Sequence, residues 1–254
     1  MIKVSVISAL KDNYIHLLSM AKGAVVIDPG EASPVLATLT RENLTLEAIV
    51  LTHRHYDHVD GVSELIVHYP NAIVYAPAGC DVESAHICAE GDNITLLNDS
   101  LILRTLATPG HTKEHVSYIG GGMAFCGDIV FACGCGRVFE GTLAQMCDSV
   151  GRLAALPDET LLYCGHEYTA ANIRFACAVE PDNTDLRRRQ VMVEKKRGAG
   201  IPTVPFTVAD EKACNPFFRL RETNVIHAAQ KYAGKTLTGD AAVFSALRRW
   251  KDSY

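Results

Sequence analysis

The sequence predicts an α/β (α+β) protein in which sheet layers are covered by helices, followed by a mostly helical C-terminal region. Two observations predict this fold class. Short β-branched apolar runs that end in Gly, Pro, Asp or His alternate with stretches whose apolar residues recur at helical spacing. After Tyr168 the strand-like runs give way to alanine-rich, charged and amphipathic segments.

The predicted elements follow one another along the whole chain. Buried strands, each followed by a loop, are expected at residues 24–30, 47–55, 71–77, 103–111, 123–128 and 160–166. Helices are expected between them at 33–41 and 61–69. Further helices are expected at 170–179, 185–197, 224–233 and 241–251, with a connecting loop at 198–206. We therefore expect one domain over residues 1–167 and a helical domain over residues 168–254.

Composition is that of an ordinary soluble protein, with 48% apolar and 21% charged residues. No apolar run approaches the ~20 residues of a membrane span, and Lys11 and Asp12 interrupt the first one before it reaches the length of a signal peptide. We therefore expect a cytoplasmic protein without a membrane partner, whose nine scattered cysteines are reduced and packed. Cys133 and Cys135 are spaced more tightly than C-x-x-C, which favours a glycine-rich loop over a metal or redox site.

Charge is distributed unevenly along the chain. Residues 1–180 carry a net charge of −11 and residues 181–254 one of +6, within a total of −5. The acidic N-terminal part argues against a nucleic-acid partner. The basic C-terminal part is either a set of solvated helix faces or an anion-binding surface.

The most specific motif is H-R-H-Y-D-H, which directly follows the strand expected around Ala48–Thr52. Four of its six residues, His53, His55, Asp57 and His58, are of types that bind zinc and related metals. Placement in a loop would let neighbouring side chains turn toward one centre, which a regular strand forbids. The alternative is a surface loop with several solvated histidines.

Three more candidate ligands follow expected strands, and a glycine precedes each. They are His111, Asp128 and His166. Each one alone would more often be a packed or capping residue. Together with the motif they make seven ligands, which suit two ions if one carboxylate bridges them. We hypothesise that Asp128 is the bridge, because a carboxylate has two oxygens whereas an imidazole offers one free nitrogen.

These residues resemble the metallo-β-lactamase superfamily. Within it, the chain is similar to the glyoxalase II, or hydroxyacylglutathione hydrolase, family with a C-terminal helical domain. Further similar segments are D-N-Y (12–14), V-I-D-P-G (26–30), T-P-G-H-T (108–112), G-C-G-R-V-F-E-G-T (134–142), C-G-H-E-Y-T (164–169), N-P-F-F-R (215–219) and R-R-W-K-D (248–252).

The resemblance implies an αββα sandwich with a metal-binding catalytic domain, and a helical substrate-binding domain. It implies that His53, His55 and His111 hold one ion, that Asp57, His58 and His166 hold the other, and that Asp128 bridges. It also implies glutathione contacts from five residues, which are Arg137, Phe139, Tyr168, Arg248 and Lys251. For Arg248 and Lys251 the alternative is a solvated face of the last helix.

The implied activity is hydrolysis of S-(2-hydroxyacyl)glutathione thioesters, such as S-D-lactoylglutathione, to glutathione and D-lactate. This is the second step of methylglyoxal detoxification. A metal-bridging hydroxide is the expected nucleophile, with Asp57 and Asp128 as the catalytic residues. We expect two divalent ions per chain, zinc first and iron or manganese as alternatives, and a monomer that takes a small glutathione thioester.

Three positions depart from the family pattern without removing a ligand. They are Arg54, where the family often has His, Asp60, where it usually has Gly, and Phe139, where some members have Tyr. Asp28 could support a ligand or form a turn. The rival functions are a single-iron glutathione persulfide dioxygenase, a β-lactamase, a nuclease and a non-catalytic metal-binding or redox module.

Overall fold

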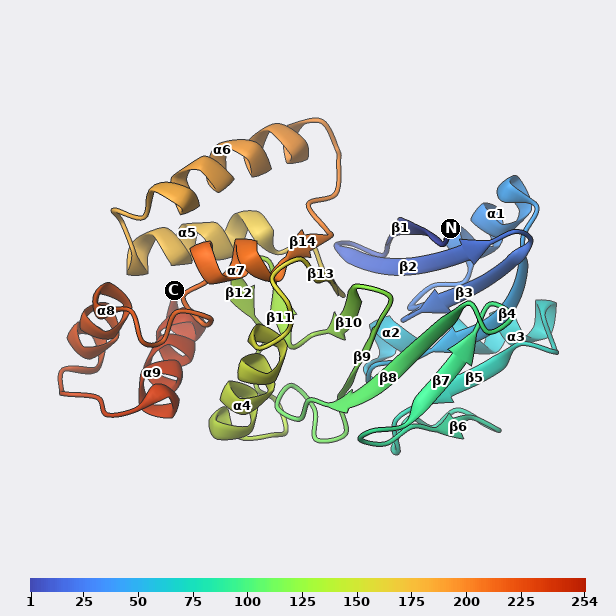
Figure 1. Ribbon diagram of the computed structural model, residues 1–254, viewed down its shortest axis with the longest axis horizontal. Helices are drawn as coiled ribbons and strands as arrows, with labels where there is room; N and C mark the ends of the chain where they lie inside the picture. Colours follow the sequence, from blue (N-terminus) through green and yellow to red (C-terminus); the bar gives the residue numbers. More distant parts are fainter. The chain divides into compact units, whose positions relative to one another are not determined.

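The computed structural model describes all residues from 1 to 254 (Figure 1). By their internal contacts they form two compact units. The first unit holds residues 1–107 and 114–127, and the second holds residues 108–113 and 128–254.

The first unit contains a six-stranded sheet in which the strands follow sequence order. Its first three strands pair in antiparallel fashion, and the remaining pairs are parallel. The strands are β1 (Lys3–Ala9), β2 (Asn13–Met20), β3 (Gly23–Ile27), β4 (Thr45–Val50), β5 (Ile73–Ala76) and β6 (His86–Ile87). Strand β3 is buried along its whole length, as expected for a strand covered on both faces.

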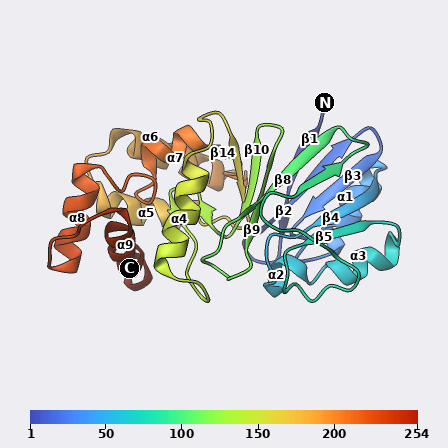
Figure 2. The ribbon, with the colours of Figure 1, turned by 60° about the horizontal axis from the view of Figure 1, so that its bottom comes forward.

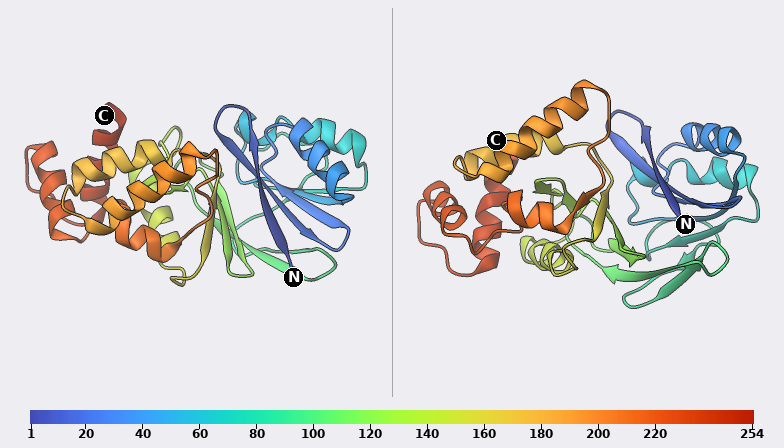
Figure 3. Two further views of the ribbon diagram at one scale, coloured as in Figure 1. Left: turned by 90° about the horizontal axis from the view of Figure 1, so that it is seen from above. Right: turned by 45° about the horizontal axis from the view of Figure 1, so that its top comes forward.

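Helices α1 (Ser33–Glu42) and α3 (Val62–His68) cover one face of this sheet (Figure 3). Helix α1 makes the crossover that the parallel pair β3–β4 requires. It starts with a proline at its first turn and ends at Asn43, which takes the left-handed conformation common at helix ends. Buried side chains from both layers, such as Leu39 and Leu65 on the helices and Val26 and Ile49 on the strands, form the core.

A second antiparallel sheet faces the other side of the first. Within this unit it contains β7 (Asn93–Leu96), β8 (Leu101–Ala107), β9 (Val116–Gly120) and β10 (Met123–Gly127). The Tyr118 hydroxyl on β9 donates to the carbonyl oxygen of Leu51 at 2.9 Å, and the rings of His16 and Phe125 lie 5.9 Å apart. These contacts join the two sheets into a sandwich.

The second unit is mostly helical (Figure 2). Its short strands are β11 (Val130–Phe131), β12 (Gly134–Cys135), β13 (Leu161–Cys164) and β14 (Phe206–Thr207). Its helices are α4 (Leu143–Ala154), α5 (Thr169–Val179), α6 (Thr184–Gly198), α7 (Val208–Cys214), α8 (Thr223–Ala233) and α9 (Asp240–Ser253). Apolar residues of α5 and α6, among them Ile173 and Val193, pack around Cys133.

A buried carboxylate joins three segments of this unit. Glu211 on α7 is fully buried and accepts from the Cys133 N–H at 2.8 Å and from Asn215 Nδ2 at 2.7 Å. Arg189 Nη1 on α6 lies 2.7 Å from it. Burial would lower the pKa of Arg189, but the carboxylate of Glu211 more than offsets this and raises that pKa above its ordinary value.

The expected strands and C-terminal helices are all present, with ends shifted by a few residues. The sequence did not predict the strands β1, β2, β7 and β9, the short strands β6, β11, β12 and β14, or the helices α2 (Tyr56–Val59), α4 and α7. The C-G-C segment is a tight hairpin rather than an open loop, since β11 pairs with β12 and Cys133 takes a φ of 58°. All nine cysteines are free thiols, as expected, and no helix is both long and apolar enough to span a membrane.

Candidate metal centre

The first group of candidate ligands starts where the parallel strands β3 and β4 end. Asp28 follows β3, takes a left-handed conformation with a φ of 52°, and its N–H donates to the carbonyl oxygen of Val50 at 3.0 Å. The Asp28 carboxylate accepts from the Thr52 N–H at 2.8 Å and from the Thr52 hydroxyl at 2.7 Å. Asp28 therefore has both of the roles that the sequence left open, as a turn residue and as a partner of the ligand segment.

These hydrogen bonds determine which ring nitrogen of His53 is available to a metal ion. The Thr52 hydroxyl gives its proton to Asp28, so its oxygen accepts from His53 Nδ1, 3.0 Å away. The Nε2 atom of His53 then carries a lone pair, and it lies 3.1 Å from Nδ1 of His55. Two imidazole nitrogens that face each other at this distance suit a shared cation. The buried ring of His115 stacks on His53, with centroids 4.9 Å apart.

Asp57 and His58 lie on the one-turn helix α2 (Tyr56–Val59), where a loop was expected. His58 Nδ1 lies 3.1 Å from Asp28 Oδ2, which leaves Nε2 for a metal. Asn13, from the D-N-Y motif, donates through Nδ2 to Asp57 Oδ2 at 3.0 Å and to the Asp57 carbonyl oxygen at 3.1 Å. Gly30 of V-I-D-P-G approaches the Asp57 backbone so closely that a Cβ would collide with it.

The second unit contributes the other three candidate ligands. Asp128 Oδ2 lies 3.4 Å from His111 Nε2 and 3.3 Å from His166 Nε2. His111 Nδ1 lies 2.8 Å from the carbonyl oxygen of Arg137, which can only accept, so Nε2 is again the free nitrogen. One oxygen of this carboxylate thus faces two imidazoles, and a bridge between two ions through Asp128 stays a prediction.

The two groups of ligands are connected through the chain. Strands β4, β8 and β10 of the first unit end near one another, since the Val116 N–H donates to the Thr52 carbonyl oxygen at 2.9 Å and Val116 pairs with Ala107. Gly127 takes a φ of +44° and leaves no room for a Cβ beside Thr52. Asp128 follows Gly127 directly, as His53 follows Thr52. The segments that carry His53, His111 and Asp128 therefore leave the first unit from one edge, whereas His166 follows β13 of the second unit.

The donor set fits a divalent metal. Five imidazoles and two carboxylates are ligands that zinc, iron and manganese accept, and His53, His58, His111, Asp128 and His166 are buried. Isolated buried histidines and carboxylates are unfavourable, and ligation is a common reason for gathering them. The fold and its His/Asp clusters thus indicate a divalent metal site.

The predicted substrate contacts all lie in the second unit, and two of them are ion-paired to one acid. Arg248 is 5% exposed, and its Nη1 donates to the Cys135 carbonyl oxygen at 2.8 Å. Arg137 is largely exposed, and its Nε lies 3.3 Å from Asp252 Oδ1, which also accepts from Arg248 Nη2 at 3.0 Å. The alternative of a solvated helix face is therefore wrong for Arg248.

The other three substrate candidates contact aromatic rings. Phe139 is 60% exposed, and its ring lies edge-on to His111 at 5.2 Å. Tyr168 stacks on His166 at 4.8 Å with nearly parallel planes. Lys251 Nζ lies 5.7 Å from the ring centre of Phe175. Burial, and then the charge of Arg248, lower the pKa of Lys251 to about 8.

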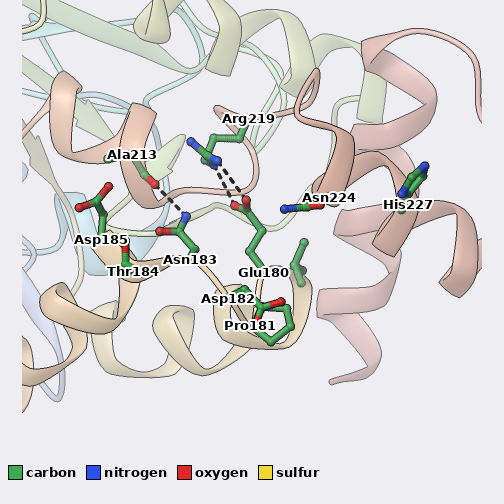
Figure 4. A pocket seen from close by; sticks show the side chains of 11 residues that line it. Glu180, Pro181, Asp182, Asn183, Thr184, Asp185, Ala213, Arg219, Asn224 and His227 are labelled. Carbon is green, nitrogen blue, oxygen red and sulfur yellow. Dashed lines mark hydrogen bonds and ion pairs between the residues drawn. The ribbon is translucent and has the colours of Figure 1, made fainter.

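A separate polar pocket lies between the start of α6 and helices α7 and α8 (Figure 4). Its buried acid, Glu180, is neutralised by Arg219 through contacts of 2.8 and 3.0 Å. Asn183 caps α6 and donates to the Ala213 carbonyl oxygen at 3.0 Å. These pairings hold helices together, so we assign the pocket no metal-binding role. The ion pair with Glu180 also gives a structural role to Arg219, the last residue of the N-P-F-F-R motif.

Sequence reasoning did not assign Asn13, Thr52 and Asp252 to the site. Asn13 and Asp252 lie inside the D-N-Y and R-R-W-K-D motifs, which was the only signal available. Thr52 adjoins a ligand but belongs to a strand-like run, so nothing in the sequence marked it.

Comparisons with known proteins assign the chain to a family. Residues 14–83 and 90–166 match the family model of the metallo-β-lactamase superfamily, and residues 167–254 match that of the hydroxyacylglutathione hydrolase C-terminus. Relatives named hydroxyacylglutathione hydrolase from Cupriavidus metallidurans and Nitrosomonas eutropha are 48% and 45% identical, over the whole length of both chains.

The chain belongs to the hydroxyacylglutathione hydrolase family. A solved structure, ETHE1 from Myxococcus xanthus, is similar in fold, with a TM-score of 0.66 and 25% identity over 100% of this chain and 99% of that one. The predicted fold class, the predicted superfamily and the prediction of a hydrolase are thereby confirmed. The predicted division at residues 167 and 168 stays a prediction.

Proposed function

We propose that this chain hydrolyses S-(2-hydroxyacyl)glutathione thioesters, such as S-D-lactoylglutathione, to glutathione and the free 2-hydroxy acid. The full-length similarity to hydroxyacylglutathione hydrolases carries this proposal. The placement of Asp128 between His111 and His166 supports a binuclear form of the site. In this form His53, His55 and His111 hold one ion, Asp57, His58 and His166 hold the other, and Asp128 is shared.

Two divalent ions, when bound, lower the pKa of water toward ~7 and polarise a carbonyl oxygen. Zinc is our first expectation, with iron or manganese as alternatives, because mixed His and carboxylate ligands accept all three. The net reaction adds water across the C–S bond. The acyl carbon gains a C–O bond and the sulfur leaves as a thiolate. With a thiol pKa near ~8.5, this leaving group needs little protonation.

The chain's own residues orient the groups that react. Asn13 fixes the Asp57 carboxylate, so that one oxygen points in a constant direction. Asp28 and the Arg137 carbonyl oxygen fix the tautomers of His58 and His111. Phe139 and Tyr168, which lie against His111 and His166, are proposed to contact the glutathione part of the substrate.

The direct test is to incubate metal-loaded protein with S-lactoylglutathione and follow the loss of thioester absorbance. Rapid loss with release of free thiol is expected. Oxygen consumption with glutathione persulfide in place of thioester hydrolysis would instead favour the persulfide dioxygenase. Metal analysis should find two ions per chain, and a value well below two after supplementation would contradict the binuclear site.

The two catalytic carboxylates can be tested by substitution. Asp57→Asn and Asp128→Asn should each lower kcat far more than they raise KM, because both groups act on the reacting atoms rather than on glutathione. Steady-state kinetics at matched metal content checks this. A raised KM with an unchanged kcat would contradict the assigned roles. A cytoplasmic location and a monomeric state remain part of the proposal.

A further inference from the structure

Four charged side chains gather at the end of α9 and beside β12. Arg248, Lys251 and Asp252 lie on the last turns of α9, and Arg137 lies two residues after β12. A single oxygen of Asp252 faces both arginines, at 3.3 Å from Arg137 Nε and 3.0 Å from Arg248 Nη2. Two arginines thus share one carboxylate, and Lys251 lies within the electrostatic influence of all three. The group keeps an excess of positive charge that suits an anionic ligand.

The two arginines are held very differently. Arg248 is buried and also donates to the backbone carbonyl oxygens of Cys135 and Gly136, so it keeps its position whatever Asp252 does. The Arg137 side chain is 57% exposed, and Asp252 is its only side-chain partner. An exposed ion pair of this kind contributes about 0–1 kcal/mol, so Arg137 can exchange one carboxylate for another at little cost.

We propose that Asp252 is an internal carboxylate that competes with a carboxylate of the glutathione thioester for Arg137. It thereby sets KM and the release of glutathione. This inference rests on the proposed function. A substrate carboxylate presents the same kind of oxygen to the same N–H donors, so it can replace Asp252 without leaving Arg137 unpaired. The negative charge of Asp252, which Arg248 retains nearby, weakens the binding of any such anion.

The substitution Asp252→Asn separates charge from shape, because asparagine keeps an acceptor oxygen and the same size. We expect KM for S-lactoylglutathione to fall roughly two- to fivefold and inhibition by glutathione to strengthen by a similar factor. We expect kcat not to rise. Asp252→Glu, which keeps the charge, should retain the KM of the original protein.

The matched control is Asp240→Asn. Asp240 is an exposed acid on the same helix, paired to Arg221 at 3.0 Å and apart from this cluster. The same charge change there should leave KM unaltered. In the R137A background, the further change D252N should lower KM much less than it does in the original protein. An unchanged or raised KM in D252N with an unaltered melting temperature would overturn the proposal, as would a fall in KM that is equally large without Arg137.

Binding of glutathione by calorimetry keeps this inference apart from the proposed activity. Tighter binding of glutathione to D252N in a protein that does not cleave the thioester would sink the proposed function and leave the role of Asp252 standing. If the original protein and D252N both cleave the thioester and bind glutathione with equal affinity, only the role of Asp252 is contradicted.

Discussion

At the scale of the residue, single hydrogen bonds determine which ring nitrogen of His53, His58 and His111 is available to a metal ion. Asp28 controls two of them, because its carboxylate holds Thr52, which orients His53, and also faces His58. In the second unit a backbone carbonyl oxygen performs the same task for His111. Partners of this kind determine both the direction and the tautomer of a ligating imidazole.

Asp28→Asn should therefore weaken metal binding about 10- to 100-fold. The NH₂ group of the asparagine would face N–H and O–H groups that now donate hydrogen bonds to the Asp28 carboxylate, so two donors would oppose each other. Competition with a chromophoric chelator measures the affinity. Asp60→Asn, at the exposed end of α2, is the control and should bind metal normally. Equal losses in both variants would show that Asp28 has no special role.

The lowered pKa of Lys251 predicts a pH dependence of substrate binding. With a pKa of about 8, the amine is charged below this pH and neutral above it. The attraction that we propose between Lys251 and a glutathione carboxylate would thus be present at lower pH and lost as the pH rises through 8. KM should rise over this range, as measured by initial rates at several pH values.

Lys251→Arg should remove this pH dependence, because arginine stays charged throughout. If the original protein and the arginine variant show the same KM profile between pH 7 and about 9, the pH effect arises elsewhere and the assignment to Lys251 fails.

At the scale of the element, buried polar contacts with other segments hold the hairpin β11–β12 in place, because its strands are too short to be stable through their own pairing. Two-residue strands cannot hold themselves together. The Cys133 N–H donates to Glu211, and Asn215 Nδ2 donates to the Gly134 carbonyl oxygen at 2.9 Å. This hairpin leads directly to the segment that carries Arg137 and Phe139. Residues on and just after helix α7 therefore hold the segment that carries two of the proposed substrate contacts.

Glu211→Gln should destabilise the protein by about 3–5 kcal/mol, since it leaves Arg189 charged and buried without a counter-ion. Denaturant unfolding measures this. The control is Asp158→Asn, which removes the exposed pair with the neighbouring Lys212 and should cost less than ~1 kcal/mol. Similar losses in both variants would mean that burial does not matter at this pair.

At the scale of the whole molecule, the proposed ions would be held by side chains that lie far apart in the sequence, from His53 to His166. A ligand that binds only the folded state stabilises it by about 2.7 kcal/mol at a hundredfold excess over its Kd. The ions should therefore stabilise the fold as well as support catalysis.

Removal of the metals by a chelator should lower the melting temperature and abolish hydrolysis, and zinc should restore both. Differential scanning calorimetry of the chelated and the reloaded protein checks this. A melting temperature that is identical with and without metal would contradict the proposed metal centre.

The sequence by itself determined the seven candidate ligands, most of the strands that precede them and the family. It could do so because buried strands and metal-ligand spacing are local patterns, readable over a few residues. The tertiary structure decided which imidazole nitrogens are available, that Arg248 is buried, and that Asp252 and Glu211 contact Arg137 and Cys133. Those features depend on contacts between residues 24 to 115 positions apart, and hydrophobic periodicity carries no information about such pairings.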